Sequence, residues 1–477
     1  MSAIGDIPTN LGHRLGRGRL LGFGLYLLVA LSLPSQWLFW DDIGFLLAAE
    51  AGDLDYGHLL YLPCLRFFHW LISPLKDSPE YAAKLFSMIG GALAFVLLWN
   101  RFERSRPRIT ALILALFVTA TPFFWRQLSL VEPSTWTFSW LLITALAAEN
   151  YGRRRGLGAM ALLTACYGVT LGFHLASVFA LPWLFWLARG PARAPEKREL
   201  LVPLALGLVA LLAAEAIGDP LARIGAFAQY WKSFVTLGSD QSHFELFTNV
   251  LSNGAPVLTL LSLGALFFAW RGERGELFSW LMLGVPYLIG FLVFGRPVVG
   301  LLLPFTLAMG GVLATRVRAW EAAGPRITHT VLVLGLVGQG FVSMAFALHH
   351  ATTPDEEKQS ATLVAGALPE NSVVIAGELA HHIRWHTDAP VVPAPNLMHS
   401  RTESESTSLE LLHAECDRLL EAHEAVYVTN EAVDYLEAYW GIARTEFPQD
   451  DPQTIVVREN PPLALLLLAG RREGSRR

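Results

Sequence analysis

The sequence predicts an α-helical polytopic membrane protein with about eleven transmembrane helices, followed by a small C-terminal α/β domain. Hydrophobic residues make up 53% of the 477 positions and charged residues only 16%, and the mean hydropathy is +0.40. A single soluble core cannot bury so much apolar surface. Apolar runs of spanning length recur until residue 350, and short β-rich runs then alternate with amphipathic segments.

The candidate spans are apolar runs close to the roughly 20 residues that a helix needs to cross the hydrocarbon core. The first is predicted to be a retained helix and not a signal peptide, because Leu33-Pro34-Ser35 offers no small-x-small cleavage site. The break at Gly172-Phe173-His174 divides one long apolar stretch into two short spans. The candidate spans are residues 20–39, 80–99, 108–124, 133–149, 157–172, 174–188, 199–217, 249–270, 277–294, 298–315 and 328–349.

The basic loops predict the orientation of these spans. With the division at Gly172, every basic cluster falls on one side of the membrane, which is expected to be the cytoplasmic side. These clusters are residues 13–19, 101–108, 153–155, 189–198, 271–274 and 316–326. The opposite face then holds the first outer loop, residues 40–79, and the C-terminal domain. We expect a multi-pass protein of a bacterial inner (plasma) membrane.

The chain is predicted to divide into a transmembrane domain, residues 1–350, and a soluble extracytoplasmic α/β domain, residues 351–477. The second part holds 21 acidic and 10 basic residues, a net charge of −11; because the whole chain carries −5, residues 1–350 carry +6. This distribution argues against a nucleic-acid partner. The expected strands are residues 373–376, 391–392, 425–429 and 463–468, and the expected helices are residues 356–367, 378–386, 406–422 and 431–440.

The sequence requires no cofactor. The C-terminal domain has no Gly-rich phosphate loop, so no nucleotide is expected. Cys64, Cys166 and Cys416 are far apart in unlike surroundings, and we interpret them as free thiols. A divalent metal is compatible with carboxylates that meet a phosphate, but nothing in the sequence demands one.

The acidic pair Asp41 and Asp42 follows the first apolar run, beside Trp40. Two carboxylates at a membrane boundary repel each other and lose water, which favours a role as general base. The alternative is that Asp42 caps a helix over residues 42–51. That segment and residues 58–72 are amphipathic, so both are expected to lie in the membrane interface as a lid or side wall.

Other polar residues of the outer face have two interpretations each. Glu132 before Pro133 is expected either to cap the next helix or to bind substrate. His174 is either a packed core residue or a substrate contact, and Arg296 either snorkels or holds a phosphate bidentately. Asp53-Leu54-Asp55 matches the DxD pattern of nucleotide-sugar enzymes only weakly. The candidate donor- or acceptor-binding residues are His58, Arg66, Arg126, Glu132, His174, Lys232 and Arg296.

The order of these parts resembles the GT-C superfamily of multispanning glycosyltransferases, most closely its protein O-mannosyltransferase-like branch. The resemblance covers about residues 20–190 and rests on Trp40-Asp41-Asp42, the two interfacial helices, Leu130-Val131-Glu132, and residues 168–175 followed by Pro182. The chain departs from the branch after the acidic residue, where it has Asp55-Tyr56-Gly57-His58, and at Phe173, where the branch often has Asn.

The resemblance implies a glycosyltransferase that moves a sugar from a polyprenyl-phosphate donor to a hydroxyl group of a protein, lipid or glycan on the extracytoplasmic face. It assigns Asp41 or Asp42 as the base of an inverting hexosyl transfer. Arg296, with Arg126 or Lys232, would hold the phosphate. The alternatives are a lipid or polysaccharide transporter, for which internal repeats and mid-span charges are expected, and an inactive membrane scaffold of the same fold.

Overall fold

The computed structural model describes residues 17–35, 38, 40–51, 58–189, 202, 205–207, 209, 248, 251, 254–269, 274–294, 302–377, 379–394, 408–447, 455–459 and 462–470. The chain forms two compact units. The helical unit comprises residues 1–35, 48–225 and 240–352, and the C-terminal unit comprises residues 36–47, 226–239 and 353–477.

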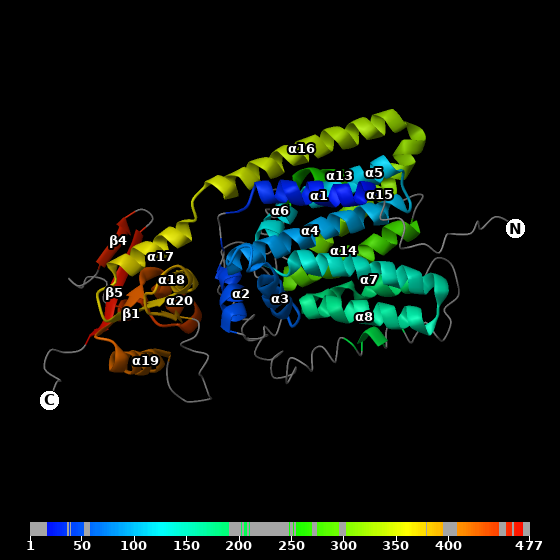
Figure 1. Ribbon diagram of the computed structural model, residues 1–477. Coiled ribbons are helices and arrows are strands. Elements are labelled where there is room, and N and C mark those ends of the chain that lie inside the picture. Colours follow the sequence, from blue (N-terminus) through cyan, green and yellow to red (C-terminus); the bar gives the residue numbers. More distant parts are fainter. Residues whose placement is uncertain are drawn as a thin grey trace, which may run out of the picture. The chain divides into compact units, whose positions relative to one another are not determined.

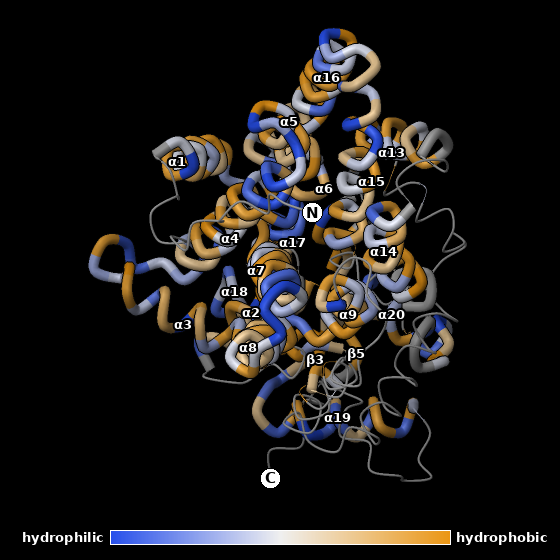
Figure 2. The backbone as a smooth tube through the Cα atoms, turned by 90° about the vertical axis from the view of Figure 1, so that its right-hand side faces the viewer, coloured by the Kyte–Doolittle hydropathy of each residue, from blue (hydrophilic) through white to orange (hydrophobic). Residues whose placement is uncertain are grey.

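The helical unit is built from apolar helices whose larger members lie side by side in Figure 1, and hydrophobic residues predominate along them in Figure 2. Its described helices are α1 (Arg17–Ser32), α3 (Tyr61–Ile72), α4 (Pro79–Glu103), α5 (Arg108–Thr119), α6 (Pro122–Ser129), α7 (Ser134–Arg154), α8 (Leu157–Phe173), the 3-10 helix η2 (Leu175–Ala180), α9 (Leu181–Arg189), α13 (Pro256–Ala269), α14 (Arg274–Phe294), α15 (Leu302–Ala323) and α16 (Pro325–Thr352).

Among the described residues, α4 and the helix that begins at Pro325 are long and apolar enough to cross a membrane, and a bent pair raises the number from two to three. Shorter apolar helices occupy several of the other predicted spans. The count of about eleven spans therefore stays a prediction, and the bundle itself is confirmed as mostly helical.

The predicted span 108–124 is not one straight helix. Helix α5 ends at Thr119, and α6 starts at Pro122 with its axis turned by 67°. Proline lacks the N–H that would continue α5, and it is favoured at the first position of a new helix. The Thr121 hydroxyl caps that helix by accepting a hydrogen bond from Phe124 N at 3.1 Å. The bend turns Trp125 and Arg126 away from the course of α5.

Helix α3 has the amphipathic character predicted for the first outer loop. Tyr61, Leu62 and Leu65 are buried, whereas Phe67 and Trp70 are exposed. An exposed apolar face on a short helix is typical of a segment that lies in a membrane interface.

The C-terminal unit contains a five-stranded sheet in the order β2-β1-β3-β5-β4. Strand β1 (Ser372–Ala376) pairs in parallel with β2 (Val391–Pro393) and β3 (Ala425–Thr429), whereas β5 (Pro462–Gly470) pairs antiparallel with β3 and with β4 (Ile455–Glu459). Its helices are α17 (Glu356–Ala367), α18 (Leu379–His386), α19 (Ser408–Ala422), α20 (Asn430–Trp440) and the 3-10 helix η6 (Arg444–Glu446). The predicted α/β elements are confirmed, and β4 is an additional strand.

Residues 36–47, which include most of α2 (Trp40–Ala51), belong to the C-terminal unit. Asp355 holds this segment by accepting a hydrogen bond from Leu38 N at 3.2 Å through Oδ2. Its Oδ1 accepts from the backbone N–H groups of Glu357 and Lys358 at 3.0 and 3.1 Å and so caps α17. One buried carboxylate therefore joins the segment that carries the acidic pair to the first helix of the domain.

The Asp355→Ala substitution removes three acceptor contacts at once. We expect a loss of about 1–2 kcal/mol of unfolding free energy, the usual cost of a lost helix cap, and a more protease-sensitive segment around Leu38. Limited proteolysis and thermal unfolding of the purified protein measure both effects. Thr362→Ala is the control, because its hydroxyl bonds only the Lys358 carbonyl on the exposed side of α17. Equal proteolysis of both variants would contradict the role of Asp355.

Candidate functional site

The first turns of α7 are fixed against α4, and we call this end of the helical unit the Glu132 end. The Trp136 indole N–H donates to the carbonyl of Phe86 at 2.8 Å, and the Ser139 hydroxyl donates to the carbonyl of Gly90 at 2.7 Å. The rings of Trp136 and Phe86 stack with centroids 4.7 Å apart. These contacts place the segment before α7 in a fixed position.

Glu132 lies beside the Pro133 N-cap of α7 without capping the helix. Its carboxylate accepts a hydrogen bond from the Ser134 hydroxyl at 3.0 Å, and among the described residues no backbone N–H donates to it. Burial raises the pKa of Glu132, because its effect exceeds the lowering by the Arg126 charge and the Ser134 hydrogen bond. The interpretation of Glu132 as a helix cap is therefore wrong, and a ligand-binding role remains.

The raised pKa of Glu132 predicts a pH-dependent effect of Glu132→Gln. The folded state binds the carboxyl proton more tightly than the unfolded chain does, so stability falls as the pH rises above the ordinary Glu pKa and through the folded value. Glutamine resembles the neutral acid, and we expect the variant to unfold at a higher temperature than the wild type at pH 8 and at an equal temperature at pH 4. Thermal unfolding in detergent at both pH values measures the difference. A variant that is less stable than the wild type at pH 8 would contradict the assignment.

His58 and His174 meet at the same end of the unit, with ring centroids 4.6 Å apart and planes at 85°. The His174 Nδ1 atom accepts a hydrogen bond from Ala176 N at 3.2 Å, so a neutral His174 carries its proton on Nε2. The Nδ1 atom of His58 lies 2.9 Å from the Phe173 carbonyl oxygen, which only accepts, so this nitrogen donates. The sequence analysis predicted both residues on the outer face, and the two rings are in contact in the structure.

The predicted break in the chain at Gly172 is what allows this contact. Helix α8 ends at Phe173, and His174 has the extended conformation φ −160°, ψ 118°. The backbone N–H of Leu60 donates to the Gly172 carbonyl at 2.7 Å, and a Cβ atom on Gly172 would lie 2.6 Å from the Leu60 side chain. Only glycine lets the segment around His58 approach so closely.

The Gly172→Val substitution is expected to separate His58 from His174 and to lower the thermal midpoint of unfolding by several degrees, because overpacking costs about 1–3 kcal/mol. Gly158→Val in the same helix is the control, since a Cβ atom there meets nothing within 4 Å. Thermal unfolding of both variants gives the comparison. A smaller loss for Gly172→Val than for Gly158→Val would contradict the packing account.

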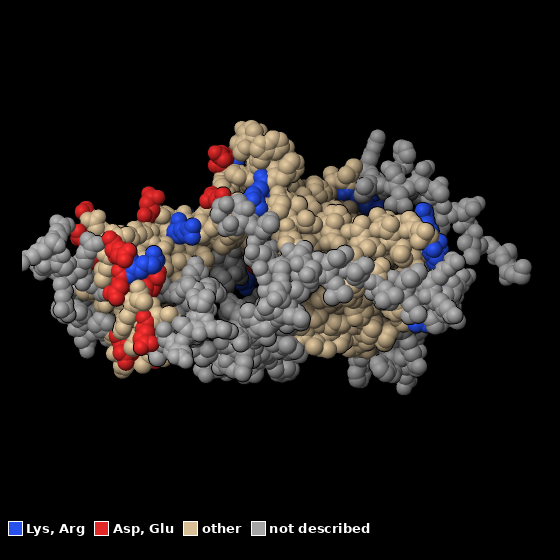
Figure 3. Space-filling model, turned by 90° about the horizontal axis from the view of Figure 1, so that it is seen from below, with Lys and Arg blue, Asp and Glu red and all other residues tan. Residues whose placement is uncertain are grey.

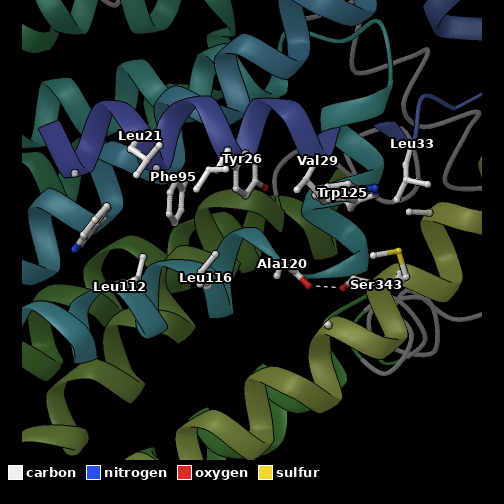
Figure 4. A pocket seen from close by; sticks show the side chains of 17 residues that line it. Leu21, Tyr26, Val29, Leu33, Phe95, Leu112, Leu116, Ala120, Trp125 and Ser343 are labelled. Atoms are coloured by element: carbon white, nitrogen blue, oxygen red, sulfur yellow. Dashed lines mark hydrogen bonds between the residues drawn. The ribbon is translucent and has the colours of Figure 1, made fainter. Parts of the chain in front are cut away.

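An apolar groove of about 480 Å³ runs along α1, between this helix and α5 and α16 (Figure 4). Its lining extends from Gly18 of α1 to Leu33, the residue after the helix, about 22 Å at 1.5 Å per residue. Leu21 and Val29 are exposed on its wall, and exposed apolar side chains of this kind fit lipid chains. The polar contact drawn in Figure 4 joins the Ser343 hydroxyl to the Ala120 carbonyl oxygen.

Trp125 lines the groove, and Arg126 follows it in α6 without belonging to the lining. The positive charge of Arg126 acts on the carboxyl of Glu132 and on His350 at the end of α16. His350 is almost entirely buried. Ala347 of the same helix lines the groove. A groove of this kind near a cation suits a lipid that carries an anionic head group.

Asp42 lies in the first turn of α2, which starts at Trp40, so the predicted helix start is two residues late and Asp42 is not its N-cap. Its side chain is fully buried, with 0% exposed. A buried carboxylate in a first helical turn is stabilised by the N-terminal end of the helix dipole. Asp41 lies in the same turn, and its side chain is outside the described residues.

The structure brings together four of the candidate binding residues, His58, Arg126, Glu132 and His174, at the Glu132 end. Arg66 lies in α3, where its Nε atom donates to the Leu62 carbonyl at 3.5 Å. Lys232, Arg296 and the Asp53-Leu54-Asp55 triplet lie outside the described residues. Within the described part of the chain, no group of three or more His, Cys, Asp or Glu residues could hold a metal ion. Sequence analysis missed the groove, because its lining comes from distant helices.

Comparison with known proteins gives matches among solved structures only; no family model and no curated protein sequence matches the chain. ArnT from Cupriavidus metallidurans in the apo state is 13% identical with a TM-score of 0.55, and 96% of this chain aligns with 100% of that one. ArnT bound to undecaprenyl phosphate aligns over the same shares with a TM-score of 0.53 and 13% identity.

The apo oligosaccharyltransferase of Archaeoglobus fulgidus is also 13% identical, with a TM-score of 0.54, and 90% of this chain aligns with 72% of that one. At such low sequence identity, these matches show similarity of the fold alone. Neither protein specifies the protein O-mannosyltransferase-like branch, which stays a prediction. The chain shares the fold of ArnT and of this oligosaccharyltransferase.

Proposed function

We propose that this protein is a membrane glycosyltransferase that moves a sugar from a polyprenyl-phosphate donor to a hydroxyl acceptor on the extracytoplasmic face of a bacterial inner membrane. The observation that carries the proposal is the apolar groove lined by Trp125, the residue that precedes Arg126 in α6. The fold supports it, because one structure of the same fold holds undecaprenyl phosphate. The acceptor is a protein, a lipid or a glycan.

The donor chain occupies the groove along α1, and Arg126 binds its phosphate, assisted by Arg296 and Lys232. The raised pKa of Glu132 favours its neutral form more than in an ordinary glutamate, which reduces its competition with the phosphate for the Arg126 charge. His58 and His174 contribute hydrogen bonds to the sugar or the acceptor.

The acceptor hydroxyl loses its proton to Asp42 or Asp41 as its oxygen attacks the anomeric carbon. The bond from that carbon to the phosphate oxygen breaks on the opposite face, and polyprenyl phosphate leaves with both electrons of the bond. The configuration of the anomeric carbon is inverted. The base role comes from the resemblance, and the buried position of Asp42 is consistent with it. The reaction requires no cofactor, and a divalent metal is compatible with it.

The test is incubation of the purified protein in liposomes with radiolabelled polyprenyl-phosphate hexoses and a mixture of hydroxyl acceptors. A new labelled glycoside supports the proposal. Movement of intact donor to the other leaflet without a product would overturn it in favour of a transporter. A protein that binds donor but neither transfers sugar nor moves donor would overturn it in favour of a scaffold.

A further inference from the structure

A cavity of about 900 Å³ lies at the end of the helical unit opposite the Glu132 end. It forms where α4, α7 and α9 end and α14 begins. Helix α7 has 21 residues, so about 30 Å separate the two ends. Lys and Arg side chains gather at this end in Figure 3. We call it the arginine cavity, because its charged lining is Arg101, Arg104, Arg153 and Arg189 with Glu149 and Glu276.

Both carboxylates of the lining are already engaged. Glu149 pairs with Arg101, and its Oε2 atom accepts from Arg104 Nη1 at 2.8 Å. Glu276 lies 3.0 Å from Nη2 of Arg106, a fully buried arginine behind the wall. Two carboxylates are therefore shared among three arginines, and neither is left to pair with the other cationic side chains of the cavity.

Arg153 and Arg189 are the other two arginines of the lining. Within the described part of the chain, neither has a carboxylate partner. Burial is the largest cause of the lowered pKa of Arg104. The charges of Arg153 and Arg101 lower this pKa further, whereas the charge of Glu149 raises it. The cavity thus carries an excess of positive charge, which an anion would relieve.

Two buried donors at the wall lack an acceptor. The Nε–H of Arg101 and the indole Nε1–H of Trp280 have no hydrogen-bond partner among the described residues. The Arg101 guanidinium is fixed 5.1 Å from the ring centroids of both Trp183 and Trp280, so it cannot turn toward water without losing this packing. Buried donors without acceptors are costly, and they indicate a ligand rich in oxygen.

We propose that the arginine cavity binds a phosphate ester, independently of the reaction at the Glu132 end. Guanidinium groups recognise phosphate through paired, charge-assisted hydrogen bonds. The volume exceeds the needs of a simple anion and matches that of sites for larger ligands, and Trp186 and Leu187 supply an apolar side. Anionic phospholipids of the cytoplasmic leaflet and soluble phosphate esters share this chemistry.

The test measures phosphatidylglycerol binding to the delipidated full-length protein by native mass spectrometry. The variant is the Arg153→Gln/Arg189→Gln double substitution, which removes two unpaired charges and no ion pair. Arg154→Gln is the matched control, because Arg154 is exposed on the same helix and does not line the cavity. We expect binding about tenfold weaker in the double variant and unchanged in the control.

Ser105→Glu provides a second variant, because it adds a carboxylate to the lining and should weaken binding similarly. Competition by sn-glycerol 3-phosphate separates the sources: displacement of the lipid at equal concentration identifies a site for soluble esters, and no displacement identifies a lipid head-group site. Equal affinity of the wild type and the double variant for both ligands would overturn the proposal. Glycosyl transfer plays no part in this measurement, so its outcome is separate from that of the proposed function.

Discussion

Asp42→Asn is expected to lower sugar transfer by about 10²–10⁴-fold, the usual contribution of a general base. Asparagine keeps the size of the side chain but cannot accept the proton of the attacking hydroxyl. Asp42 is buried in the first turn of α2, and a neutral amide there avoids the cost of a buried charge, so the folded protein should persist. Initial rates with labelled donor, together with thermal unfolding of the same samples, measure both effects.

The companion variant Asp41→Asn shows which of the two aspartates is the base, because substitution of the base causes the larger loss of transfer rate. Asp77→Asn is the control, because the Asp77 side chain is 83% exposed and contacts only His69. Donor binding should be retained in all three variants. Full turnover in both Asp41→Asn and Asp42→Asn would contradict the mechanism.

Arg126→Gln is expected to weaken donor binding by about 10–100-fold, the usual loss when a hydrogen bond to a charged group is removed. Arg126 follows Trp125, which lines the apolar groove, and its charge acts on Glu132. The loss should appear in KM for the polyprenyl-phosphate sugar more than in kcat, because the phosphate contact is made in the bound donor as well as in the transition state. Kinetics at several donor concentrations separate the two parameters.

Two controls make this result specific. Arg326→Gln removes an exposed arginine at the start of α16, and its KM should equal that of the wild type. Glu132→Gln removes the competing carboxylate charge and should leave donor KM unchanged or lower. An unchanged donor KM in Arg126→Gln would refute the phosphate role of this residue.

Local sequence patterns predicted most of the described elements. In the C-terminal unit, α17 spans the predicted residues 356–367 and β3 the predicted residues 425–429. Strand β4 was missed, although Asn460-Pro461-Pro462 between two apolar runs is a turn sequence. The first apolar run was predicted to continue to residue 39, but α1 ends at Ser32, because Pro34 disfavours helix at the residue before it.

The candidate site was predictable only in part. The Gly172 break and the polar residues at helix ends follow from local chemistry, and the contact between His58 and His174 confirms that they share one face. The groove depends on which side chains of α1, α5 and α16 come together, and the arginine cavity depends on how carboxylates are shared among arginines. Such features arise from packing between distant segments, which periodicity does not encode.

The most direct test of the account is a cryo-electron microscopy structure of the protein in lipid nanodiscs with polyprenyl phosphate. We predict an extended density for the prenyl chain in the groove along α1 and α16, with the phosphate in contact with the Arg126 guanidinium. A phosphate bound away from Arg126, with the groove occupied by ordinary phospholipid, would contradict the account.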